Sequence, residues 1–167
     1  MRDGADNSVG RDALLKLIGR VAGLSLKALV ESLPGIVHRR AGTDWLRTLA
    51  EVRSEAEAKG QRFWVDTLIR FAGGEHDFLQ SREFQKDYAE AQSKRAGILF
   101  RAGGQEVEAA KAFLRAAHVY RALGRGSEWR KALKNSASAL AIAGLNQGRV
   151  DYLDQAIRSY QSCIEAT

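Results

Sequence analysis

The chain has 167 residues, of which 45% are hydrophobic and 28% charged, a composition typical of a globular domain rather than a disordered segment. Its single cysteine, Cys163, excludes an internal disulfide and a cysteine metal cage, and favours a cytoplasmic location. The net charge of +6 is spread along the chain, and no stretch has the roughly 18 uninterrupted apolar residues of a transmembrane segment.

Residues 11–77 are expected to form four shorter helices after a polar, disordered leader of residues 1–10. In each segment apolar residues recur at the helical spacing of three and four. The expected caps and stops, in chain order, are Asp12, Gly23, Ser25, Pro34-Gly35, Thr43 or Asp44, Gly60 and Gly73-Gly74. Pro34 is expected to break or kink the second of these helices. The region is expected to cap a helical array, or alternatively to form a partner interface.

Residues 78–167 are expected to form four longer helices. The first is capped by Asp77, and the others end at Gly124, at Gly144 and near the C-terminus. The clearest periodicity steps by four, three, four and three residues through Ala109, Phe113, Ala116, Tyr120 and Leu123. No segment shows the alternation of a strand. The sequence therefore predicts an all-α fold of about seven or eight helices in antiparallel hairpins, with a boundary near residue 77.

A pattern of small and aromatic residues occurs twice, 47 residues apart from Ala109 to Ala156. Small residues let two helices approach closely, and an aromatic one turn later fills the space beside the crossing. The first copy consists of Ala96-Gly97, Phe100, Ala109, Phe113 and Ala116. The second consists of Ala143-Gly144, Ala156, Tyr160 and Cys163, with Gln147 at the place of the first aromatic.

On these residues, about 85–165 of the chain resembles the tetratricopeptide-repeat family. That family carries Leu-Gly-x2-Tyr on the first helix of its repeat and Ala-x3-Phe-x2-Ala on the second. The chain departs from it in its longer spacing, since that repeat has about 34 residues, in lacking the proline that ends each repeat, and in showing no copy in residues 1–77. The resemblance implies a short, divergent α-solenoid that binds other proteins.

The resemblance also implies a binding groove, lined by the outward faces of the first helices of the last two hairpins. These faces would carry Lys94, Ile98 and Arg101 from one helix and Lys134, Asn135 and Ser138 from the other. The implied ligand is a peptide or helix of a protein partner, and an acidic one would suit the lysines and the asparagine. The basic excess of residues 78–125, with nine Lys and Arg against five Asp and Glu, would attract the same partner.

Two other functions remain open on the sequence. A nucleic-acid-associated protein would use the cations Lys94, Arg95, Arg101, Lys111, Arg115 and Arg125 on phosphates. The aromatic residues of this region fall at packing positions rather than between the cations, which favours a protein partner over single-stranded nucleic acid. A small subunit of a larger complex, or a homo-oligomer, is the third alternative.

The sequence offers no constellation for catalysis, a metal or a cofactor. His38, His76 and His118 lie far apart without ligand spacing. No HExxH, GxSxG or phosphate-binding Gly-x4-Gly-Lys-Ser/Thr motif occurs. Gly124-Arg125-Gly126-Ser127 follows no strand and is interpreted as a turn with a helix cap. We therefore expect a non-enzymatic protein without catalytic residues, metal or cofactor.

Overall fold

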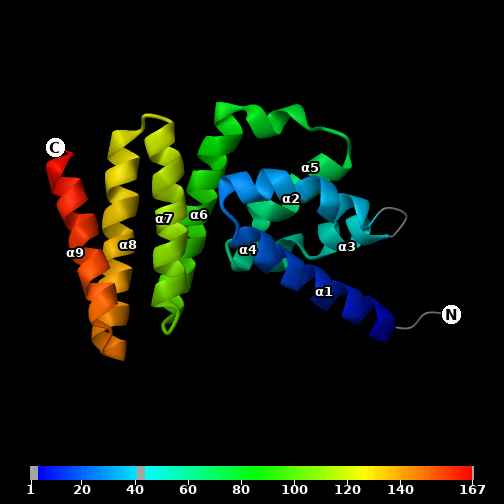
Figure 1. The fold of residues 1–167 in the computed structure, drawn as a ribbon. Coiled ribbons are helices and arrows are strands. Elements are labelled where there is room, and N and C mark those ends of the chain that lie inside the picture. Colours follow the sequence, from blue (N-terminus) through cyan, green and yellow to red (C-terminus); the bar gives the residue numbers. More distant parts are fainter. Residues whose placement is uncertain (1–3, 41–43, 167) are drawn as a thin grey trace. The chain divides into compact units, whose positions relative to one another are not determined.

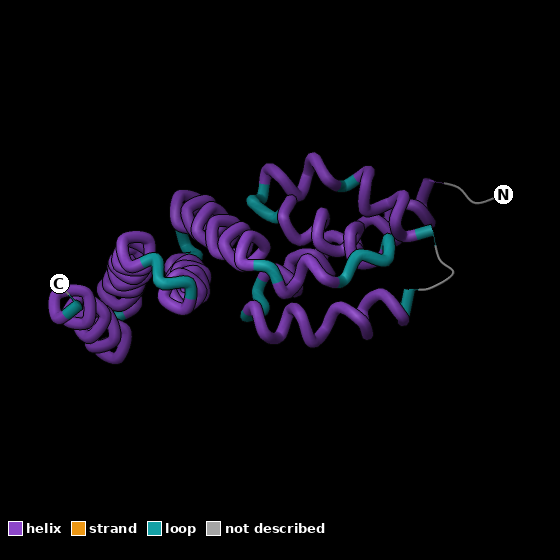
Figure 2. Tube along the Cα trace, turned by 90° about the horizontal axis from the view of Figure 1, so that it is seen from above, coloured by secondary structure: helices purple, strands orange, loops and turns teal. Residues whose placement is uncertain are grey.

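The computed structural model describes residues 4–40 and 44–166, and these residues form helices and loops without a strand (Figures 1 and 2). They contain nine α-helices and one 3-10 helix, which confirms the predicted all-α fold. Two compact units divide the chain, Met1–Phe84 (unit 1) and Gln85–Thr167 (unit 2), so the boundary lies beyond the expected residue 77. Each unit is described here by itself.

Unit 1 packs short helices around apolar side chains that are fully buried, among them Ile18, Leu29, Leu49, Trp64 and Leu68. Its elements are α1 (Gly4–Ala22), α2 (Leu26–His38), α3 (Trp45–Glu51), α4 (Arg53–Ala58), α5 (Arg62–Ala72), η1 (Asp77–Gln80) and the start of α6 (Arg82–Ala102). Ser25 caps α2 as predicted, because its hydroxyl accepts a hydrogen bond from the backbone N–H of Ala28 at 3.2 Å.

The start of the chain differs from the prediction. Helix α1 begins at Gly4, so residues 4–10, expected within a disordered leader, are helical. Residues 1–3 lie outside the described residues. The leader was inferred from polarity alone, and a polar segment extends a helix when the apolar residues that follow it are buried.

Three further expectations for unit 1 are wrong in detail. Pro34 does not break helix α2, which continues through it, because Leu33 and Ile36 on either side are buried and hold the helix in place. The helix expected between Asp44 and Gly60 is divided into α3 and α4 at the fully buried Val52. The cap of α6 is Ser81 rather than Asp77, since the Ser81 hydroxyl accepts from the N–H of Phe84 at 3.0 Å.

Unit 2 contains most of α6, with α7 (Glu106–Ala122), α8 (Gly126–Gln147) and α9 (Val150–Glu165). These helices stand side by side in chain order, joined by short turns, as antiparallel hairpins (Figure 1). Helices α6 and α7 meet through Ala96, Ala112 and Phe113. Helices α7 and α8 meet through Ala109, Ala110 and Ala139, and the buried hydroxyl of Ser136 donates to the Ala110 carbonyl at 2.8 Å.

The alanines of the repeat pattern are buried, as predicted for Ala109, Ala116 and Ala156. Helices α8 and α9 approach closely at Gly144, where an added Cβ would lie 2.9 Å from Cγ of Leu153. Gly97, the matching glycine of the first copy, is different: a Cβ there would meet only the guanidinium of Arg101, at 3.6 Å. The tetratricopeptide resemblance itself stays a prediction.

Candidate partner-binding pocket

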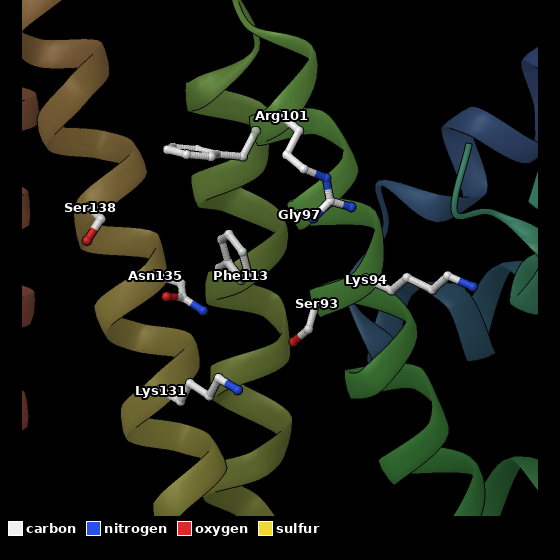
Figure 3. Close-up of a pocket in the computed structure, with 9 residues that line it drawn as sticks. Ser93, Lys94, Gly97, Arg101, Phe113, Lys131, Asn135 and Ser138 are labelled. Carbon is white, nitrogen blue, oxygen red and sulfur yellow. The ribbon is translucent and has the colours of Figure 1, made fainter. Parts of the chain in front are cut away.

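A pocket of about 470 Å³ opens between three helices of unit 2 (Figure 3). We call it the α6–α8 pocket. Helices α6 and α7 contribute its floor, and α6 and α8 contribute its two sides. Its lining residues are Ser93, Lys94, Gly97, Phe100 and Arg101 from α6, Phe113 from α7, and Lys131, Asn135 and Ser138 from α8.

Four of the six residues predicted to line a groove, Lys94, Arg101, Asn135 and Ser138, line this pocket. Ile98 and Lys134 do not, and Lys134 is exposed elsewhere on α8. The reason is helical rotation, because each of these two residues is one position away from a lining residue and is turned by about 100°. Lys131 is the lysine of α8 that lines the pocket, where the prediction had Lys134.

The floor of the pocket is apolar and is opened by Gly97. Phe113 is 8% exposed and Phe100 is half-buried. Gly97 lies inside α6, where glycine is less favourable than alanine by about 0.5–1 kcal/mol. Since no neighbouring helix needs the space above Gly97, the glycine leaves bare backbone facing the pocket. A ligand can therefore approach the backbone of α6 closely at this point.

The rim is cationic. Lys94, Arg101 and Lys131 are exposed, and no carboxylate lines the pocket. None of the three cations forms an ion pair among the described residues, although several other cations of unit 2 do. In Figure 3 Lys131 extends from α8 toward α7, while Lys94 starts on α6 and its side chain extends away from α7 and α8. Like charges without counter-charges give the pocket a positive potential that favours an anionic ligand.

The polar groups on the walls differ in their freedom to bind. The Ser138 hydroxyl lies 2.7 Å from the Tyr160 hydroxyl of α9. Ser93 hydrogen-bonds the Tyr120 hydroxyl, whose pKa is raised above its ordinary value chiefly by burial. Asn135 is half-buried and points into the space beside Phe113. Its amide can both donate and accept, so it suits the backbone of a peptide ligand.

The cations considered for nucleic acid do not form one open surface. Arg95 and Arg115 are partly buried, and burial lowers the pKa of both guanidinium groups. Lys111 pairs with Glu108 at 3.4 Å, and Arg125 pairs with Glu128, which raises the Arg125 pKa. Of the six, only Lys94 and Arg101 remain open, and both line the α6–α8 pocket. These six cations were selected for the nucleic-acid alternative by their charge alone. Charge does not show which cations are paired or partly buried.

A second pocket, of about 640 Å³, lies in unit 1 around Glu75-His76-Asp77. Its side chains are engaged with one another: Arg70 Nε lies 2.8 Å from Glu75 Oε2, and its guanidinium carbon lies 4.1 Å from the Phe78 ring centroid. The His76 ring stacks on Phe71 at 4.1 Å. No group of three His, Cys, Asp or Glu side chains within residues 10–40 and 44–166 is arranged to hold a metal.

The described helices include none with the length and apolar character needed to cross a bilayer. In comparisons of sequence and fold, the chain matches no family model, no curated protein and no solved structure.

Proposed function

We propose that the chain is a non-enzymatic protein-interaction module that binds a peptide or helix of an acidic partner in the α6–α8 pocket. The observation that carries this proposal is the combination of an apolar floor opened by Gly97 with a rim of three cations that no carboxylate neutralises. The tetratricopeptide-like pattern of residues 85–165 and a cytoplasmic location belong to the same proposal.

The size and chemistry of the pocket suit part of a partner rather than a whole ligand. A volume of about 470 Å³ accepts a few side chains. One apolar side chain of the partner packs on Phe100 and Phe113, and its acidic groups lie toward Lys94, Arg101 and Lys131. Asn135 bonds the partner's backbone where it passes Gly97. Charge gives orientation and association rate, and the apolar contact gives most of the affinity.

Selection of binders from a library of random displayed peptides tests this function. We expect the selected peptides to combine acidic residues with an apolar anchor. The double variant Lys94→Glu/Lys131→Glu should weaken the best peptide by at least about tenfold in titration calorimetry, since a loss of 1.4 kcal/mol corresponds to that factor. The matched control is Lys27→Glu/Lys134→Glu, which makes the same charge change outside the pocket and should bind nearly as well as the parent.

Two results would count against the proposal. Equal loss of binding in both double variants would mean that net charge, not the pocket, governs binding. Binding of single-stranded RNA or DNA that falls steeply with salt and is indifferent to sequence, without peptide binding, would favour the nucleic-acid alternative instead.

A further inference from the structure

Two arginines of unit 2 bury hydrogen-bond donors that have no acceptor. Arg95 lies on α6 and Arg115 on α7, and both side chains are partly buried. Nε and Nη1 of Arg95 and Nε and Nη2 of Arg115 are shielded from solvent and donate to no atom of the described residues. Buried donors are almost always paired, because an unpaired one loses its hydrogen bonds to water without replacement. These four nitrogens therefore need an acceptor that the described chain does not supply.

The two arginines lie outside the α6–α8 pocket. Arg95 is two residues before Gly97, and Arg115 is two residues after Phe113, and both Gly97 and Phe113 line that pocket. Two residues turn an α-helix by about 200°, so each arginine projects from the opposite face of its helix. The unpaired donors therefore do not belong to the surface proposed for the peptide partner.

A buried tyrosine lies beside both guanidinium groups. Tyr88 and Gln92 are fully buried on the same face of α6 as Arg95, and the Gln92 amide donates to the Tyr88 hydroxyl at 3.1 Å. Burial raises the pKa of Tyr88, the Gln92 hydrogen bond lowers it, and the charges of the two arginines lower it as well. Arg95 and Arg115 thus act on one phenol oxygen, which places their charges in one cluster.

The positive charge of this cluster exceeds the negative charge beside it. Burial lowers the pKa of both arginines, and the charge of Arg115 lowers that of Arg95 further. The carboxylate of Glu108 opposes this lowering at both, but it also pairs with Lys111 at 3.4 Å. Like charges held together away from water are costly. Water molecules offer hydrogen bonds without charge, whereas an anion offers both.

We propose that Arg95 and Arg115 bind a phosphate group, either the free ion or the phosphate of a small ester. A phosphate group carries a charge of about −1.5 to −2 at pH 7 and at least three acceptor oxygens. It therefore matches two guanidinium groups better than a carboxylate does. Nε and Nη2 of Arg115 share one edge of the guanidinium group and can donate in parallel to two phosphate oxygens. Because both side chains are partly exposed, the ion reaches them by a shift of their flexible stems.

Binding of inorganic phosphate to the full chain tests this site. Titration calorimetry gives the Kd, and phosphate at ten times that concentration should raise Tm by about 3–6 °C at constant ionic strength. Arg115→Met keeps an unbranched side chain but removes the charge. Its Kd for phosphate should rise by at least about tenfold. Its Tm without phosphate should stay close to that of the parent, because apolar replacement of a buried charge is often neutral or stabilising.

Three comparisons make the test specific to the two arginines. Arg115→Lys keeps the charge but not the parallel donors, so its affinity for phosphate should lie between those of the parent and Arg115→Met. Arg158→Met, which changes an exposed arginine of α9, is the matched control and should respond like the parent. Lys94→Glu/Lys131→Glu should also respond like the parent, since those lysines line the α6–α8 pocket. Phosphate stabilises proteins in general by exclusion from their surface, and that effect is common to all variants.

Glycerol phosphate identifies the source of the phosphate group. If it stabilises the parent but not Arg115→Met, the ligand is a small ester; if only inorganic phosphate does so, the ligand is the free ion. A parent that binds neither compound overturns the proposal, and so does a phosphate response that survives in Arg95→Met/Arg115→Met. A response lost in Lys94→Glu/Lys131→Glu but kept in Arg115→Met would place the phosphate in the α6–α8 pocket instead.

Discussion

Replacement of Gly97 by alanine should stabilise the chain and weaken the binding of its ligand at the same time. The new methyl group would meet only the flexible guanidinium of Arg101, 3.6 Å away, so no packing conflict opposes it. Alanine is more favourable than glycine inside a helix by about 0.5–1 kcal/mol. For a chain of this size 1 kcal/mol corresponds to about 2–4 °C, and we expect Tm to rise by about 1–4 °C.

The same methyl group occupies the floor of the α6–α8 pocket. Peptides selected on the parent should bind Gly97→Ala more weakly, and Gly97→Leu, which keeps a strong helix former, should lose at least about tenfold in affinity. Differential scanning fluorimetry measures Tm, and titration calorimetry measures the affinity. Most variants that weaken binding also destabilise the fold, so opposite signs of the two effects separate a ligand-binding role from a structural one.

Gly144→Ala is the matched control for this substitution. Its Cβ would lie 2.9 Å from Cγ of Leu153 and 3.0 Å from the Arg149 carbonyl oxygen. We expect it to destabilise the chain by about 1–3 kcal/mol through overpacking and to leave the affinity of the remaining folded protein unchanged. A fall in Tm for Gly97→Ala, or unchanged peptide affinity for Gly97→Leu, would refute the reasoning about the pocket floor.

Three further predictions concern unit 2. Ser136→Ala removes the 2.8 Å hydrogen bond to the Ala110 carbonyl and should reduce the free energy of unfolding in urea by about 0.5–1.5 kcal/mol, because that carbonyl lies inside α7. Ala109→Leu should reduce it by about 1–3 kcal/mol, because Ala109 is fully buried between helices; an unchanged melting curve would contradict that packing. Burial raises the pKa of Tyr120 above 10.0, so the folded chain holds this proton longer than the unfolded one. Stability should therefore fall as pH rises above about 10, and less steeply in Tyr120→Phe when Tm is followed against pH.

The sequence predicted the helices well where one face is apolar over several turns. The small residues of α7 and α9 identified the buried crossings because only small side chains fit there. The prediction of helix bounds from the sequence failed where two local signals compete. Asp77 and Ser81 are both good caps, and only the burial of Phe78 and Leu79 between them shows that the long helix starts at the second. Val52 has the spacing of a continuous helix, so the break between α3 and α4 could not be read from it.

The candidate site was predicted in part for a related reason. Residues three, four or seven apart share a helix face, so placing Lys94 and Arg101 together required only a helix. The absolute rotation of α8 depends on which side chains α7 accepts. The prediction placed Lys134, the neighbour of the lining residue Asn135, in the groove, whereas Lys131, four residues before Asn135, lines the pocket. The exposure of Ile157 and Ile164 on α9 was not predicted, because both residues have the sequence character of core residues. Exposure is a property of the neighbours, which the periodicity of one helix does not contain.

Gly97 and Gly144 have different surroundings, although the two repeat copies match in sequence. Both follow an alanine and precede an alanine by twelve residues, and the pattern alone assigns both to close helix crossings. In the second copy Leu153 reaches across the turn and fills the space at Gly144. In the first copy the corresponding space stays open beside the apolar floor of Phe100 and Phe113, and cations and an amide border it. The glycine of the second copy thus admits a neighbouring helix, whereas the glycine of the first copy lies beside the open α6–α8 pocket, where we propose that a ligand binds.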